Sequence, residues 1–220
     1  MIDRTLLVAL REVFAERRHP DGLVAALTFT GMVVLLESLA LGPGRARQPD
    51  VASGIFWIAI LFSATLVSQR SFDRDLEDDA IDAVLALPGG RDAIYAGKVV
   101  ALGMITGLVA VAAGVMAILL LSLEIALPLH LVLLLALGIV ALAPVIVLVH
   151  VLALRVRARV AVVPIIAFPM LTPQLVAATQ GTAAAISGDA TAALGWAGLL
   201  AAFALVYTVL GVTIVPAAIE

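Results

Sequence analysis

The sequence predicts an all-α membrane protein in which six transmembrane helices form a single domain over residues 1–220. Of the 220 residues, 63% are hydrophobic and only 13% are charged, against about 45–50% and about 25% in soluble domains. The apolar residues gather in six segments, each near the ~20 residues that a helix needs to cross a hydrocarbon core. This composition leaves too little polar surface for a water-soluble enzyme.

Several other classes of protein are excluded by residues that the sequence lacks. There is no cysteine, which rules out disulfides, thiolate metal sites and haem attached through thioethers. The net charge of −3 provides no basic field for nucleic acid. The pair Gly97-Lys98 lacks the flanking residues of a P-loop, so the chain is not expected to hydrolyse ATP itself. No catalytic motif is present, and we expect neither an enzyme nor a tightly bound cofactor or metal.

The first 22 residues are predicted to form an amphipathic helix at the membrane surface. They carry too many charges for a secretory signal. Leu6, Leu10 and Phe14 recur at helical spacing, whereas Arg4 and Arg11 fall on another face. An apolar stripe flanked by arginine is typical of helices that lie in the interface.

Six continuous apolar segments follow. Because no backbone group can stay unpaired in lipid, each is expected to be a helix, and their continuity argues against the short alternating strands of a barrel. The predicted spans are Leu23–Leu41, Val51–Ser68, Val99–Leu123, Leu129–Leu154, Val160–Ala178 and Ala192–Val215.

The orientation follows from the distribution of Lys and Arg. Eleven of the thirteen lie before the first span, in the loop between the second and third, or in the loop between the fourth and fifth. The other side holds only Arg45 and Arg47. Loops rich in Lys and Arg stay in the cytoplasm, so both termini are predicted to be cytoplasmic.

Residues 69–98 form the one substantial loop, and it contains a second predicted amphipathic helix, Phe72–Leu87. Pro88 and two glycines end this helix. Its exposed face is expected to be acidic, which suits a basic groove on a partner protein better than anionic lipid. A solvated turn between two spans is the alternative. The acidic face consists of Asp75, Asp78, Asp79 and Asp82.

Polar residues inside the spans mark a second candidate region. Pro164, Pro169 and Pro173 each remove a backbone donor from the fifth span, which predicts a broken helix. Such breaks are tolerated where protein or a water-filled cavity covers them, so this span is a candidate substrate path or hinge, or else a packed kink. Glu37 is the one acidic residue well inside a span. It is either functional or reaches the interface.

Two histidines in the fourth span, His130 and His150, lie about 30 Å apart at ~1.5 Å per residue, so they cannot share one metal. Either one could bind a porphyrin iron, or could anchor its helix near the head groups.

The arrangement of an N-terminal amphipathic helix, six spans and a cytoplasmic coupling helix after the second span resembles an ABC-2-type permease. The stretch SQRSFDRDLEDDAIDAVLALPGGRDAIYAGKVVA resembles the CcmB family, the haem-exporter-type permeases of cytochrome c maturation, and Asp79 stands where that family has Gly. RVRARVAVVPIIAFPMLTPQLVAA resembles the family's basic loop and its proline-containing span. The matching positions of the first stretch are Phe72, Glu77, Asp78, Ile81, Asp82, Leu85, Pro88, Tyr95, Gly97 and Lys98.

The resemblance implies a multi-pass permease of the bacterial plasma (inner) membrane that pairs into a homodimer. It implies a separate ABC ATPase subunit of the CcmA type, further cytochrome c maturation subunits and a haem chaperone. Haem is the implied substrate, and ATP binds to the partner subunit. Whether haem itself is transported, or its loaded chaperone is released, stays open. The alternatives are a permease for another lipid, glycan or drug, and a non-transporting membrane scaffold.

The topology is tested by reporter fusions. Fusions after Arg47, Ala126 and Gly188 are expected to report the extracytoplasmic side, and fusions after Gly90 and Arg157 the cytoplasmic side. A cytoplasmic signal after Gly188 would contradict the six-span topology.

Overall fold

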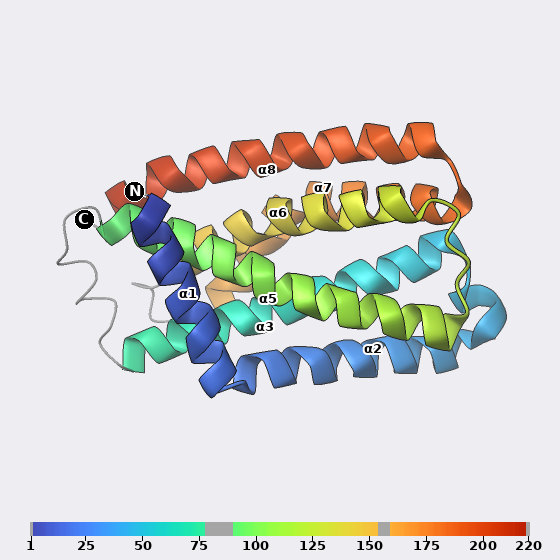
Figure 1. Cartoon of the computed structure of the whole chain (residues 1–220), viewed down its shortest axis with the longest axis horizontal. Coiled ribbons are helices and arrows are strands. Elements are labelled where there is room, and N and C mark those ends of the chain that lie inside the picture. Colours follow the sequence, from blue (N-terminus) through green and yellow to red (C-terminus); the bar gives the residue numbers. More distant parts are fainter. Residues whose placement is uncertain (1, 78–89, 154–158, 219–220) are drawn as a thin grey trace.

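The computed structural model describes residues 2–77, 90–153 and 159–218, and within these ranges the chain is helical apart from short connections. Figure 1 shows long helices running side by side, with α1 lying across them at one end, where both termini are found. We call this the α1 end of the bundle. The helices are α1 (Ile2–Arg18), α2 (Asp21–Ala46), α3 (Pro49–Glu77), α5 (Gly90–Leu121), α6 (Pro128–Ala153), α7 (Arg159–Ser187) and α8 (Ala190–Ala218).

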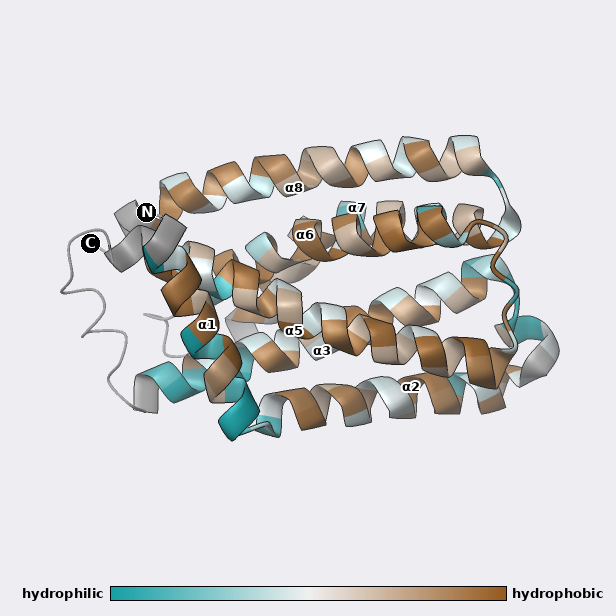
Figure 2. Cartoon of the chain, in the orientation of Figure 1, coloured by the Kyte–Doolittle hydropathy of each residue, from teal (hydrophilic) through white to brown (hydrophobic). Residues whose placement is uncertain are grey.

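The core is built around α6, which packs against α3, α5, α7 and α8. From Ala141 to Val151 every residue of α6 is buried, and Figure 2 shows apolar residues along the length of the bundle helices. A helix that is apolar all round belongs in a protein core or a membrane. On the outer surface, α2, α5 and α8 also expose many large apolar side chains, as expected of helices that face lipid.

A few buried hydrogen bonds fix the register of neighbouring helices. The hydroxyls of Thr30 and Ser63, on α2 and α3, lie 2.7 Å apart. Trp57 Nε1 donates to Thr182 Oγ1 at 2.9 Å and joins α3 to α7. Tyr95 Oη donates to Pro144 O at 3.2 Å, so that the start of α5 is tied to α6. Each bond satisfies polar atoms that would be costly to leave unpaired in an apolar interior.

Five of the described helices are long and apolar enough to cross a membrane: α2 over Asp21–Gly42, α3, α5, α6 and α8. Five of the six predicted spans therefore lie in helices that are long and apolar enough to cross a membrane. The remaining predicted span lies in α7, which is as long as its neighbours and packs against α3, α6 and α8. Besides its prolines, α7 carries the polar residues Thr172 and Gln174.

Two local predictions need correction. No separate helix begins at Phe72, because α3 continues without a break to Glu77, and no Gly or Pro interrupts residues 55–77. The fifth span is also not broken, since α7 stays helical through its prolines. At their level, Thr172 Oγ1 donates to Phe168 O at 2.7 Å and Tyr207 Oη donates to Met170 O at 3.4 Å. Side chains commonly supply such bonds beside membrane prolines.

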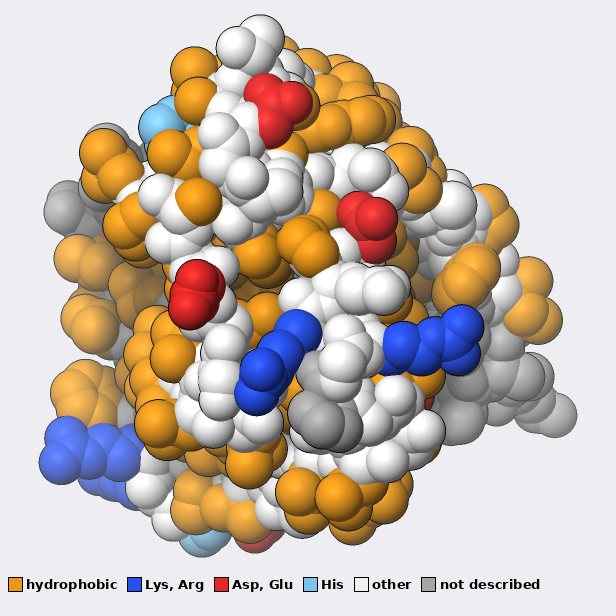
Figure 3. Space-filling model, turned by 90° about the vertical axis from the view of Figure 1, so that its right-hand side faces the viewer, with side chains coloured by type: hydrophobic (Ala, Val, Ile, Leu, Met, Phe, Trp, Pro, Cys, Tyr) orange, Lys and Arg blue, Asp and Glu red, His pale blue; other side chains and the backbone are white. Residues whose placement is uncertain are grey.

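The end of the molecule opposite α1 carries the short connections between α2 and α3, α5 and α6, and α7 and α8. Figure 3 looks onto this end, where acidic and basic side chains are scattered among apolar ones and form no single patch. Arg47 Nε donates to Leu121 O at 2.8 Å. This bond satisfies a carbonyl at the C-terminus of α5 that has no partner within its own helix.

Candidate functional site

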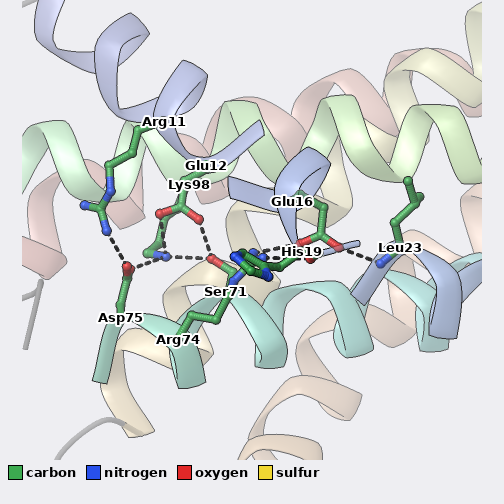
Figure 4. A network of polar contacts seen from close by, with 9 residues as sticks. All are labelled: Arg11, Glu12, Glu16, His19, Leu23, Ser71, Arg74, Asp75 and Lys98. Carbon is green, nitrogen blue, oxygen red and sulfur yellow. Dashed lines mark hydrogen bonds and ion pairs between the residues drawn. The ribbon is translucent and has the colours of Figure 1, made fainter. Parts of the chain in front are cut away.

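A network of charged side chains joins α1, the last turns of α3 and the start of α5 at the α1 end of the bundle (Figure 4). Helices α3 and α5 are connected by residues 78–89, which lie outside the described residues. Most of the predicted amphipathic helix Phe72–Leu87, which we call the docking segment, falls there. The network therefore lies at the base of that segment, on both sides of it.

Lys98 is the centre of the network, and its side chain is 3% exposed. Its Nζ lies 2.6 Å from Asp75 Oδ2 and 3.1 Å from Glu12 Oε1, and it donates to Ser71 Oγ at 2.7 Å. All three hydrogens of the ammonium group thus have acceptors. The same nitrogen lies 4.5 Å from the centre of the Phe72 ring, where the negative face of the ring attracts a cation.

The acceptors of Lys98 are themselves joined to further groups. Arg11 donates from Nη2 to Asp75 Oδ1 at 2.7 Å, and Ser71 Oγ donates to Glu12 Oε2 at 2.7 Å. Two cations therefore meet two carboxylates, and the four charges balance. The buried carboxylates of Glu12 and Asp75 depend on this balance because an unpaired charge in such a place is strongly unfavourable.

A second ion pair extends the network toward α2. Glu16 is 2% exposed and accepts from Arg74 Nη2 at 2.7 Å. Its other oxygen accepts from the backbone N–H of Leu23 at 2.6 Å. That N–H lies in the first turn of α2, where the helix has no acceptor of its own. Glu16 thus caps α2 from the preceding helix, and Arg74 also donates to His19 O at 3.3 Å.

An amphipathic helix that packs on a bundle usually turns its apolar face inward, whereas α1 turns its apolar face outward. The side of α1 that is buried carries Ala9, Glu12 and Glu16, whereas Leu7 and Phe14 are exposed. Close packing at Gly97 allows this, because a Cβ there would lie 2.5 Å from Val8 Cγ1. The carboxylates of Glu12 and Glu16 consequently face the protein, and the apolar stripe of α1 faces away from the bundle.

Apolar and aromatic groups lie beneath the charges. The Phe72 ring is stacked on the imidazole of His150, with centroids 5.5 Å apart and planes inclined by 6°. His150 Nδ1 lies 2.8 Å from Ile146 O and 3.3 Å from Ser68 Oγ. This layer connects the end of α3 to α6, so the network is coupled to the core helix as well as to α1 and α5.

The residues of the predicted helix Phe72–Leu87, together with Pro88 that ends it, fall into two groups in the structure. Phe72 and Asp75 belong to the network, and Glu77 ends α3. The expectation that Asp75 lies on an exposed acidic face is wrong, because it is 6% exposed and paired with Arg11 and Lys98. The other predicted residues, Asp78, Asp79, Asp82 and Pro88, lie outside the described residues.

Sequence reasoning missed Glu12, Glu16 and Lys98 as a set. The signal was present in part, since Glu12 and Glu16 stand four residues apart and so share one face of a helix. Lys98 is also the one lysine of the chain and immediately precedes an apolar segment. The α3 partners of Glu16 and Glu12 lie 58 and 59 residues further along the chain, and no local pattern could pair them.

The predicted path residues do not come together in one place. Pro169 and Pro173 lie on α7, next to a cavity of about 80 Å³ among α3, α6 and α7 that is lined by His150, Phe62 and Phe168. Gln174 of α7 is buried, and neither of its amide atoms has a partner among the described residues. Pro164 also belongs to α7, whereas Glu37 lies on α2, which packs against α3 and α5.

Removing the central cation tests whether the network stabilises the chain. Lys98→Met leaves Glu12 and Asp75 with one cation between them and is expected to destabilise the protein by about 3–5 kcal/mol. Thermal unfolding in detergent measures this loss. Adding Glu12→Gln restores the charge balance and should recover part of it, whereas Arg18→Gln, at an exposed position of α1, is the control with little effect. A melting temperature of Lys98→Met equal to that of the wild type would show that the ion pairs contribute nothing.

Comparison with known proteins finds one matching family and several curated relatives. The family model described as "CcmB protein" matches residues 4–220. Heme exporter protein B of Escherichia coli (strain K12) is 34% identical over 108 residues, which is 49% of this chain and 48% of the relative. The protein of that name from Paracoccus denitrificans is 31% identical over 112 residues, covering 50% and 51%. That of Rhodobacter capsulatus is 33% identical over 104 residues, covering 47% and 48%.

These alignments span about half the length of the curated relatives. The family model, by contrast, covers nearly the whole chain, including the network, the membrane helices and the proline-containing α7. The apolar helices and the network between α1, α3 and α5 are thus features of a family member. The chain belongs to the CcmB family.

Proposed function

We propose that the chain is the permease subunit of an ABC transporter complex that exports haem, or releases a haem-loaded chaperone, during maturation of c-type cytochromes. The family match and the relatives named heme exporter protein B support this assignment. ATP is bound and hydrolysed by a separate ATPase subunit of the CcmA type. The chain acts as a homodimer in a bacterial inner membrane, together with further membrane subunits and a haem chaperone.

The observation that carries the proposal is the position of the charged network. Asp75 lies two residues from the end of α3, and Lys98 lies in the third turn of α5. Their ion pair therefore joins the two stems of the segment that connects these helices. A force applied to that segment reaches α3 and α5 together, and Glu12 transmits it to α1. This is what an ATP-driven permease needs between its docking segment and its spans.

The proposed topology has six spans, with α7 as the fifth, and both termini in the cytoplasm. The α1 end is then the cytoplasmic end, since it carries Arg4, Arg11, Arg17 and Arg18. The exposed stripe of α1, with Leu6, Leu7 and Leu10, enters the lipid of the cytoplasmic leaflet. Arginines beside that stripe reach the head groups, as in other interfacial helices.

The docking segment is proposed to bind the ATPase through its acidic residues. Phe72 and Asp75 anchor its base in the network, which leaves Glu77, Asp78, Asp79 and Asp82 for the partner and Pro88 to end the segment. A basic cleft would attract these carboxylates, mainly by orienting the partner and raising its association rate. Because exposed ion pairs are screened over ~10 Å at 0.1 M salt, the contact is expected to weaken with salt.

The proposed docking is tested by reversing charge. Asp78→Arg with Asp82→Arg is expected to abolish co-purification of the ATPase while the permease still inserts, because a basic cleft would repel the new arginines. Asp189→Arg, at the other end of the bundle, is the matched control and should retain the ATPase. Recovery of the ATPase at wild-type yield with the doubly reversed permease would eliminate this segment as the docking element.

The substrate path or hinge is proposed at α7, with Pro164, Pro169 and Pro173 on that helix and Glu37 as a separate contact on α2. Pro169 and Pro173 leave the carbonyls of Ile165 and Pro169 without their usual helical donors. Nearby lie the cavity beside Phe168 and the unpaired amide of Gln174. A helix with such unsatisfied groups can rearrange at lower cost than a fully bonded one.

Replacing both Pro169 and Pro173 with Ala tests the role of α7. The variant regains two backbone donors, so insertion and stability should be unchanged or improved. We expect maturation of c-type cytochromes to fall, because the regained bonds stiffen α7. The measurement is the yield of haem-stained cytochrome c, with Pro144→Ala in α6 as the control. Maturation at the normal rate in the double variant would contradict the hinge.

A further inference from the structure

Among the five described helices that are apolar enough to cross a membrane, α2 is the least covered. Only 17% of its most apolar window is buried, compared with 67% in α3 and in α6. It packs on α3 and α5 along one side, and the other side exposes large apolar residues, among them Met32, Leu36 and Leu39. Leu39 is 71% exposed. This face meets either lipid or a helix of another protein.

Glu37 lies on this exposed face. Among the residues that the structure describes, none forms an ion pair or hydrogen bond with it. At one end of α2, the contact of Leu23 N with Glu16 marks the polar boundary. A core of ~20 residues that starts there ends near Gly42, where the backbone leaves the helix with φ 71°. Glu37 is five residues before that point, about 7.5 Å inside it at ~1.5 Å per residue.

The Cα–Cβ bond of Glu37 points deeper still. In an α-helix each Cα–Cβ bond tilts toward the helix N-terminus, and α2 begins at the α1 end. Glu37 therefore leans toward the middle of the membrane, away from the nearer interface. Carboxylates at such depths are usually paired with a cation. A partner for Glu37 must accordingly come from outside the described residues of this chain.

We propose that the outer half of α2 is the contact surface for a transmembrane helix of another membrane subunit, which presents a Lys or Arg to Glu37. The proposal rests on the multi-subunit complex of the proposed function. The Leu36 and Leu39 side chains pack against the partner helix, and the ion pair between Glu37 and its cation fixes the depth and rotation of that helix.

A second copy of this chain does not fit the same surface. Two copies related by a two-fold axis along the membrane normal place equal residues at equal depths, so contact between two α2 helices brings the two Glu37 carboxylates together. The copy also offers no Lys or Arg at that level. Of its thirteen Lys and Arg residues, the two on this side, Arg45 and Arg47, lie beyond Gly42. Charge complementarity therefore favours a different subunit.

The absence of cysteine from the sequence makes a direct test possible. Leu39→Cys carries a benzophenone maleimide in membranes that contain the whole complex, and Leu205→Cys on α8, also exposed, is the matched control. The expected product from position 39 is a crosslink to a transmembrane peptide of another subunit, with a Lys or Arg within one turn of the attachment point. A crosslink to a second copy of the chain, or to lipid alone, overturns the proposal.

Two further variants tie the crosslink to the charge. Glu37→Leu in the Leu39→Cys background should lower the crosslink yield at least about tenfold without changing the yield from position 205. Glu37→Lys combined with replacement of the mapped cation by Glu should restore it. An unchanged yield with Glu37→Leu overturns the ion pair. The ATPase should co-purify with Glu37→Leu throughout, because it docks at the other end. Loss of the ATPase from the wild-type complex would instead count against the proposed function.

Discussion

The ion pairs of Lys98 constrain how the α1 end of the bundle is built. A buried ammonium group requires acceptors in three directions, and α1, the end of α3 and the start of α5 are brought together to supply them. Once Glu12 and Asp75 surround Lys98, the direction of α1 across the bundle is determined and its apolar stripe is turned outward. The capping of α2 by Glu16 follows from the same placement, since Glu16 lies one turn after Glu12 on the same face. Most of the polar structure at this end therefore depends on one cation.

The remainder of the bundle is organised differently. Around α6 the contacts are almost entirely apolar, and single hydrogen bonds such as that between Trp57 and Thr182 fix the register of the helices. Lipid gives little reason for apolar helices to associate, so packing and a few polar contacts must hold such a bundle together. This contrast explains why a charged network at one end is compatible with helices that are apolar along the rest of their length. It also gives the molecule a rigid connection at the end where force is proposed to enter.

The segment between α3 and α5, where the ATPase is proposed to dock, is anchored by contacts of the described helices. The ion pair between Asp75 and Lys98 closes the base of that segment, and Phe72 connects the same base to His150 of α6. A docking event on the segment is thus linked to four helices through defined contacts. By contrast, α7 carries prolines, an adjacent cavity and the unpaired amide of Gln174. A permease must receive a force and must rearrange. The ion-paired ends of α3 and α5 suit the first task, and α7, with its unpaired polar groups, suits the second.

The sequence by itself determined the helical class, the positions of the apolar segments and the amphipathic N-terminal helix, because the pairing of backbone groups in lipid and the period of a helix are local rules. It also identified the charged segment after Ser68 and the proline-containing helix. The tertiary structure decided which face of α1 turns inward and that Asp75 is buried. The reason is physical: Ser71 and Arg74, the α3 partners of Glu12 and Glu16, lie 59 and 58 residues away in the chain, and Arg11 lies 64 residues from Asp75. A charge expected to face solvent is buried when folding brings an opposite charge to it, and only the packing of α1 on α3 and α5 does so.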